Sequence, residues 1–288
     1  MENYTINSKE QLKLLSFLKQ KNASAKDFNY AVKRPDLYTA DLEAIPTFVN
    51  DQQLKVIQKI SEKVFRIMKK IPELVFENDL DKIYENYNLK QYNIPKEIAR
   101  SILKAGVLQI DNLVSRGDFI LSKEGFKCLE VNIGSNLGGW NAYSAQKMYL
   151  ENPLIKEFVE TNHLKTKATD SLKNYLNFVL EYTLNTIKTQ DKEVNLACYY
   201  DPDANSSADK LRRSKMSSYW KKSLSGKGLK GELIYCRDLD IHDNNNLIYV
   251  KNKRIHTLLD QGMLSPISVY NSQSLNHICV INGPFGHI

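Results

Sequence analysis

The sequence lacks the signals that would direct it into a membrane or through a secretory route. No apolar run approaches the length of a membrane span, and the amino terminus, Met1 to Thr5, has no apolar signal region. Cysteine is scarce and widely spaced, which favours buried free thiols over disulfides or a zinc site. We therefore expect a cytoplasmic protein. The four cysteines are Cys128, Cys198, Cys236 and Cys279.

Several catalytic and nucleotide-binding patterns are also missing. None of the five histidines forms a pair with HxxxH metal-ligand spacing, and no Ser/His/Asp or Cys/His arrangement stands out. A glycine-rich stretch is present, but it has neither the GxGxxG spacing of a Rossmann fingerprint nor the GxxxxGK[ST] spacing of a P-loop. The sequence therefore gives no support to a side-chain nucleophile, a zinc centre or a P-loop.

The composition is that of an ordinary globular chain with a basic balance. Its 288 residues are 42% hydrophobic, enough to bury one large core or two modest ones. The net charge is +7, and the basic density is highest over residues 210–230. Three interpretations of this basic run stay open: a solvated helix followed by a loop, which we rank first; an anion-binding segment near a nucleotide or acidic substrate; and a nucleic-acid interface.

A short β-hairpin is the most informative segment of the chain. Residues 115–122 and 126–132 flank Lys123-Glu124-Gly125, which fits a three-residue loop with glycine in the left-handed conformation. This loop predicts that Ser122 lies opposite Phe126.

That register places two carboxylates face to face. Asp118 falls opposite Glu130 and Arg116 opposite Asn132, and the strand period of two puts all four on one face. Because directly opposed like charges destabilise a ladder, a positive charge is needed between them. Either Arg116 and nearby lysines neutralise a surface hairpin, or a divalent cation binds. Carboxylate and amide oxygens suit Mg²⁺, which completes its shell with water and substrate phosphates.

The segment after the hairpin is rich in glycine and small polar residues. Such a stretch directly after an apolar strand indicates backbone that comes close to a ligand, although an ordinary glycine-rich turn is the alternative. Its candidate substrate-binding residues are Gly134, Ser135, Asn136, Gly138 and Gly139.

The pattern Arg-x-Asp, hairpin, Glu-x-Asn resembles the metal-binding signature of ATP-grasp ligases. The likeness is strongest to the circularly permuted group that includes glutathionylspermidine synthetase, and it extends weakly over residues 45–288. The resemblance implies an ATP- and Mg²⁺-dependent carboxylate–amine ligase acting on a peptide-like or polyamine-like substrate. Asp118, Glu130 and Asn132 would hold Mg²⁺ against the nucleotide phosphates, and Arg116 would contact the transferred phosphate or an acyl phosphate. Such chemistry needs positioning and charge stabilisation rather than a nucleophile.

Along the chain we expect an α/β fold with α+β character. Residues 1–110 predict a mainly helical scaffold, including a helix over residues 6–20 with Leu12, Leu15 and Leu18 on one face. Residues 111–190 hold the hairpin, the glycine-rich turn and a long helix. Residues 191–288 alternate short apolar strands with helices and predict a small, mostly parallel, Rossmann-like unit.

The resemblance also predicts more nucleotide-binding elements than we can locate. In the family, further sequence after residue 288 would carry the ATP-binding lysines and a lid, so we expect a fragment, half of a split enzyme or a degenerate relative. Two alternatives to a ligase follow: an incomplete module of the same fold that binds a partner protein, and a basic protein that binds nucleic acid.

Overall fold

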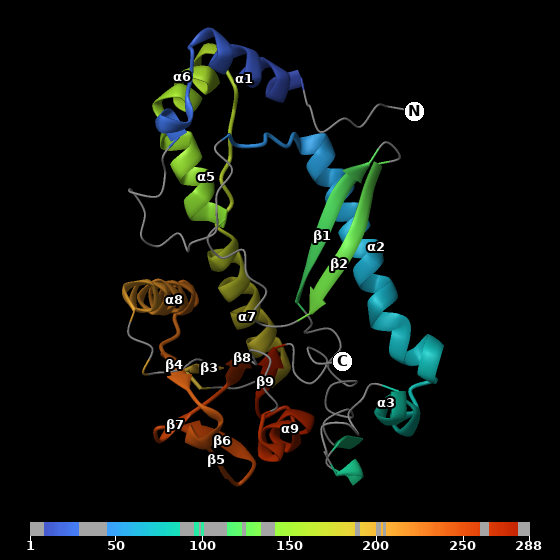
Figure 1. Cartoon of the computed structure of the whole chain (residues 1–288). Helices are drawn as coiled ribbons and strands as arrows, with labels where there is room; N and C mark the ends of the chain where they lie inside the picture. The colour runs from blue at the N-terminus through green and yellow to red at the C-terminus, as the bar shows by residue number, and fades with distance from the viewer. Residues whose placement is uncertain are drawn as a thin grey trace.

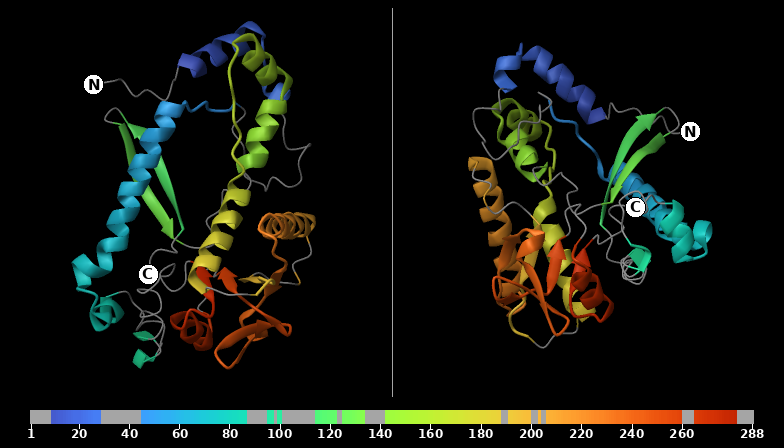
Figure 2. Two further views of the ribbon diagram at one scale, coloured as in Figure 1. Left: turned by 180° about the vertical axis from the view of Figure 1, so that it is seen from behind. Right: turned by 60° about the horizontal axis from the view of Figure 1, so that its bottom comes forward.

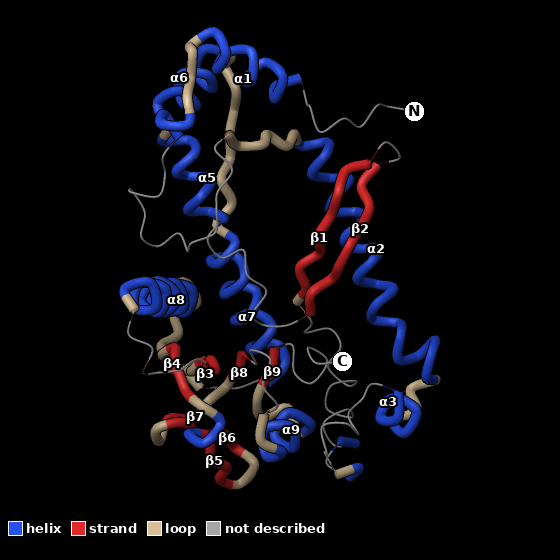
Figure 3. Tube along the Cα trace, in the orientation of Figure 1, coloured by secondary structure: helices blue, strands red, loops and turns tan. Residues whose placement is uncertain are grey.

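The computed structural model contains three groups of elements: a cluster of helices, a β-hairpin beside a long helix, and an α/β unit (Figures 1 and 3). No helix in the described part of the chain is both long and apolar enough to cross a membrane. The structure describes residues 9–28, 45–86, 95–97, 99–100, 114–122, 125–133, 142–187, 191–199, 203, 206–259 and 265–281.

The helical cluster combines segments that are far apart in the sequence. It contains α1 (Lys9–Gln20), α5 (Ala142–Glu151) and α6 (Pro153–Thr161). Asn152 caps α6 by accepting hydrogen bonds from its first turn, and its Nδ2 donates to the Asp27 carbonyl at 2.9 Å. The shared core consists of Leu14, Leu18, Phe28, Met148, Ile155 and Phe158.

The buried face of α1 includes only one leucine of the predicted stripe, Leu18. Leu12 and Leu15 are 52% and 41% exposed, whereas Leu14 and Leu18 are buried. The leucines offer more than one stripe at helical spacing, and packing against α6 decides which stripe is buried. This cluster joins residues from both sides of the boundary expected at residue 110, and the division into three domains stays a prediction.

A long amphipathic helix, α2 (Asp51–Phe76), leads into α3 (Leu80–Asn86). Asn50 and Gln53 form reciprocal side-chain-to-backbone hydrogen bonds of 2.8 and 3.1 Å at its start, the capping arrangement that satisfies two helix-end amides. The β-hairpin lies beside α2 in the views of Figures 1 and 2.

The expected parallel sheet is present. Its strand order is β4-β3-β8-β9, and every neighbouring pair is parallel. α8 (Ser207–Ser225) connects β3 to β4, and α9 (Ile267–Ser274) connects β8 to β9. The strands are β3 (Leu196–Tyr199), β4 (Leu233–Cys236), β8 (Thr257–Leu259) and β9 (Cys279–Ile281).

Both faces of this sheet are covered. The helices α7 (Ser171–Ile187) and α8 pack on one face around the fully buried Trp220. The other face packs against α9 and a small antiparallel sheet, as Figure 1 shows below the main sheet. The small sheet lies between β4 and β8 in sequence and comprises β5 (Ile241–Asn244), β6 (Leu247–Val250) and β7 (Lys253–Arg254).

A polar cluster ties the amino ends of β3 and β8 together. His256 is 2% exposed. Its Nδ1 accepts a hydrogen bond from the backbone amide of Asn195 at 3.1 Å. Its Nε2 lies 3.2 Å from the Asp191 carboxylate. Asp191 also forms an ion pair with Arg254. Burial lowers the pKa of His256 below its ordinary 6.5, against the opposing hydrogen bond of Asp191. Nδ1 as acceptor leaves the proton of the neutral ring on Nε2.

Acidification is expected to destabilise the fold through His256. Unfolded His256 takes up a proton as the pH falls through about 6.5, while the folded residue resists it, so the free energy of unfolding falls with pH below that value. Above about pH 7 both states are neutral and the residue contributes no pH dependence. Urea midpoints measured between about pH 7.5 and 5.5 should therefore fall less steeply with pH in His256→Gln than in the original chain. Identical pH profiles for the two proteins would contradict the prediction.

Candidate functional site

The hairpin brings the predicted side chains together, but the pairing of its strands near the loop differs from the predicted pairing. β1 (Ser115–Ser122) pairs with β2 (Gly125–Ile133), and Ser122 lies opposite Gly125 rather than Phe126. The predicted three-residue spacing at the loop is therefore wrong. Gly125 does adopt the expected positive φ, at 108°.

A β-bulge corrects the register. The pairing shifts between Asp118 and Phe119, because Phe119 pairs with Cys128 while Asp118 pairs with Glu130. Leu129 is thus the extra residue, and it is 64% exposed. The shorter loop moves the strands by one residue, and the bulge moves them back before the carboxylates are reached.

The facing pairs near the open end of the hairpin are as predicted: Asp118 opposite Glu130 and Arg116 opposite Asn132. Arg116 Nε and Nη2 donate to the two Asp118 carboxylate oxygens at 3.0 and 3.2 Å. The Arg116 side chain is 44% exposed and that of Asp118 is 43% exposed, so this ion pair alone contributes little stability. Arg116 therefore neutralises Asp118, which was one of the two readings of the sequence.

Two other polar groups of the hairpin are left available. Among the described residues, the carboxylate of Glu130 has no hydrogen-bond or ion-pair partner, and the buried Nδ2 of Asn132 has no hydrogen-bond partner. Because a buried polar atom without a partner is costly, the Asn132 amide is a group that a ligand or water would satisfy. An amide can present either its oxygen or its nitrogen at such a position.

The donor set fits Mg²⁺ but is incomplete by itself. Asp118, Glu130 and Asn132 offer carboxylate and amide oxygens, the ligands that Mg²⁺ prefers. In the described part of the chain no group of three His, Cys, Asp or Glu side chains could hold a metal. The remaining coordination positions would be filled by water or substrate phosphates, as is common for Mg²⁺.

The predicted substrate-binding turn lies outside the described residues. Gly134, Ser135, Asn136, Gly138 and Gly139 all fall within 134–141, which the structure does not describe. Their role stays a prediction.

The parallel sheet contains a second candidate region that the sequence reasoning did not identify. β3 leads through α8 to a strand on one side, whereas β8 leads through α9 to a strand on the other. This reversal makes the carboxyl ends of β3 and β8 a topological switch point, where ligands bind in open α/β sheets. Asp203, beyond β3, forms an ion pair with Arg237 directly after β4. The sequence Asp-Pro-Asp at 201–203, directly after an apolar strand, was the available sequence signal.

The aromatic residues of the basic run are structural. Trp220 is fully buried, and Tyr219 donates a hydrogen bond from its hydroxyl to Asp170. Burial is the larger cause and this hydrogen bond the next, and together they raise the pKa of Tyr219 to about 12. The Trp220 ring is therefore not available to stack on bases in the way that single-strand binders require, and the Lys222 ammonium lies over the Tyr219 ring, 5.9 Å from its centroid.

Comparison with known proteins supports the fold and does not identify a function. No known protein family matches the chain, and no curated protein matches it in sequence. Among solved structures, it is similar to a glutathione synthetase-like effector from Globodera pallida in its apo form, with a TM-score of 0.56 and 16% sequence identity. The match covers 98% of this chain and 64% of that one, so the chain spans less than two thirds of its neighbour's length. The chain therefore has a mixed α/β fold that resembles a glutathione synthetase-like protein.

Proposed function

We propose that this chain provides the Mg²⁺-nucleotide site of an ATP-dependent carboxylate–amine ligase of the circularly permuted ATP-grasp type, acting in the cytoplasm. The observation that carries the proposal is the pairing of Asp118 with Glu130 and of Arg116 with Asn132. The similarity to a glutathione synthetase-like fold supports it. Arg116 pairs with Asp118, but the facing carboxylate of Glu130 has no ion-pair partner among the described residues, and a bound divalent cation would neutralise it.

The residues of the hairpin have separate roles in this proposal. Asp118, Glu130 and Asn132 hold Mg²⁺, which when bound neutralises charge on the nucleotide phosphates. Arg116 lies beside a proposed metal ligand, 3.0 Å from Asp118, and contacts the phosphoryl group as it passes to the substrate carboxylate. The glycine-rich turn, residues 134–139, holds the substrate close to this group.

The substrate carries a carboxylate and an amine, because amide formation through an activated carboxylate needs both. The switch point at the carboxyl ends of β3 and β8 is a second place where part of the substrate binds. The remaining nucleotide contacts come from segments outside this chain or from a partner chain, consistent with the 64% of the neighbour that the match covers.

Calorimetric titration of Mg-ATP into the purified chain tests the proposal. We expect saturable binding with Mg²⁺ and none with ATP in excess EDTA, because the hairpin offers carboxylates that reach the nucleotide only through the metal. Binding that is equally tight in EDTA would contradict the proposal. Absence of binding by a protein with a native far-UV spectrum would also count against it.

A further inference from the structure

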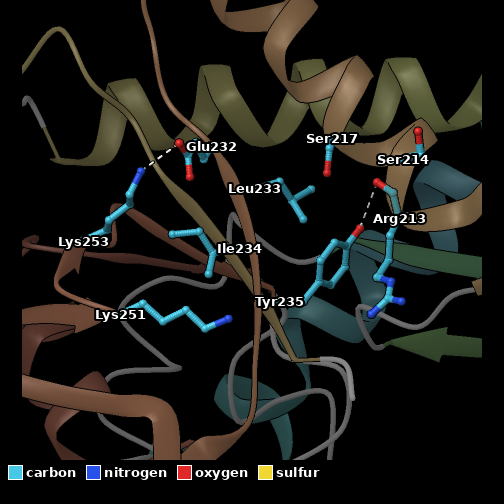
Figure 4. Close-up of a pocket in the computed structure, with 9 residues that line it drawn as sticks. All are labelled: Arg213, Ser214, Ser217, Glu232, Leu233, Ile234, Tyr235, Lys251 and Lys253. Atoms are coloured by element: carbon cyan, nitrogen blue, oxygen red, sulfur yellow. Dashed lines mark hydrogen bonds and ion pairs between the residues drawn. The ribbon is translucent and has the colours of Figure 1, made fainter. Parts of the chain in front are cut away.

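A cavity of about 460 Å³ runs along the outer side of β4 (Figure 4). One wall is the strand itself, a second is α8, and a third is the turn between β6 and β7. None of its residues belongs to the hairpin site. The lining residues are Arg213, Ser214, Ser217, Glu232, Leu233, Ile234, Tyr235, Lys251 and Lys253.

β4 is the outermost strand of the parallel sheet. It pairs with β3 on one side, and the described part of the chain places no strand on its other side. The backbone amide of Leu196 donates to the backbone carbonyl of Glu232 at 2.9 Å, so the backbone groups of Glu232 point toward β3. Since alternate residues of a parallel strand face the same neighbour, the backbone amide and carbonyl of Leu233 point away from β3, toward the open side. Such an edge is a template for another strand.

The groove beside this edge is strongly basic. Arg213 stacks over the Tyr235 ring at 5.9 Å, and Lys253 forms a 2.7 Å ion pair with Glu232. Lys251 occupies the turn, where it is exposed and, among the described residues, has no ion-pair partner.

A second cavity, of about 560 Å³, continues along α8 and shares Ser214 and Ser217 with the first. It adds two cations, Lys221 and Lys222. The two cavities together are lined by five cationic side chains and one carboxylate, Glu232, which itself is paired.

We propose that this groove, named here the β4 groove, binds an extended acidic peptide segment of a partner protein, which pairs with β4 as an added strand. An edge strand recognises a peptide backbone through main-chain hydrogen bonds, and the surrounding cations select for acidic side chains. A nucleic acid would use the cations but not the strand edge. Among the described lining residues Tyr235 is the one aromatic residue, and the Arg213 guanidinium, 5.9 Å from the centroid of its ring, competes with a stacked base. This inference is independent of the ligase proposal.

Fluorescence anisotropy with the full chain tests the β4 groove. The probe is a fluorescein-labelled peptide of about eight residues that alternates glutamate and valine. We expect saturable binding that weakens by about five- to ten-fold in Lys251→Glu, because charge reversal turns an exposed attraction into a repulsion. Lys59→Glu, on the exposed surface of α2, changes the net charge equally and should bind like the original chain.

Backbone pairing is tested with the peptide rather than with the protein, so that folding is not at risk. Methylating the peptide's backbone nitrogens on one edge keeps its charge but removes main-chain donors, and should weaken binding by at least about ten-fold. Equal binding of the methylated peptide would overturn strand addition. A labelled oligothymidylate that binds more tightly than the peptide and weakens in Lys251→Glu would assign the groove to nucleic acid and overturn the proposal. Absence of peptide binding would overturn it as well.

Discussion

Replacing both hairpin carboxylates, as Asp118→Asn together with Glu130→Gln, is expected to weaken Mg²⁺-dependent nucleotide binding by about 100-fold or more. The two amides keep the size of the side chains but remove the negative charges that hold the metal. Since Asp118 and Glu130 face each other across the strands, replacing both leaves only neutral amide oxygens around the metal. Isothermal calorimetry with Mg-ATP measures the effect.

Folding and binding can be separated in this variant. The carboxylates are half-exposed or exposed, and the Arg116–Asp118 ion pair is of the kind that contributes about 0.2–1 kcal/mol. The urea midpoint should therefore change little, since removing the repulsion between opposed charges offsets the lost ion pair. A matched control is Glu73→Gln with Asp243→Asn, which neutralises two exposed carboxylates elsewhere. If the control loses as much affinity as the hairpin variant, the site assignment is wrong.

Trp220→Ala is expected to lower the free energy of unfolding by about 3–5 kcal/mol. Trp220 is fully buried between α8 and the parallel sheet, in the core cluster that α7 and α8 form with one face of that sheet. Removing its indole leaves a cavity that the surrounding helices and strands cannot close completely. Urea unfolding followed by far-UV circular dichroism measures the loss without relying on tryptophan fluorescence.

Trp220→Phe separates volume from hydrogen bonding at the same position. In the described part of the chain the Trp220 Nε1 has no hydrogen-bond partner. Phenylalanine removes this unsatisfied donor and leaves a smaller void, so its cost should be only about 1–2 kcal/mol. Leu239→Ala, at a side chain that is 83% exposed, should stay within about 0.5 kcal/mol of the original chain. Equal losses for the alanine and phenylalanine variants at 220 would contradict this account.

In the hairpin, local sequence pattern predicted the facing side chains correctly but not the register near the loop. The facing of Asp118 and Glu130 was predicted from the alternation of side chains and a glycine at the loop, and it is confirmed. The register near the loop was wrong, because single-residue bulges have no strong sequence signature. The loop error and the unrecognised bulge at Leu129 cancel at the carboxylates.

Other features depend on contacts between distant segments. The burial of Leu14 rather than Leu15 follows from the packing of α1 against residues more than a hundred positions away. The sequence pattern predicts a hairpin between residues 247–250 and 254–257, and β6 does pair with β7 at Lys253 and Arg254. Thr257, however, begins β8, a central strand of the parallel sheet. The apolar residues of β8 are buried on both faces, a context that sequence periodicity does not reveal.

The sequence by itself determined the elements and their local chemistry: the hairpin that presents Arg116, Asp118, Glu130 and Asn132, and the alternation of strands and helices after residue 190. These depend on side-chain period, glycine conformation and strand propensity, which act over a few residues. Only the tertiary structure decided the strand order, the switch point between β3 and β8, the burial of His256 and the basic groove along β4. Each of these requires segments tens of residues apart to meet, and their meeting is set by which apolar surfaces fit together rather than by local pattern.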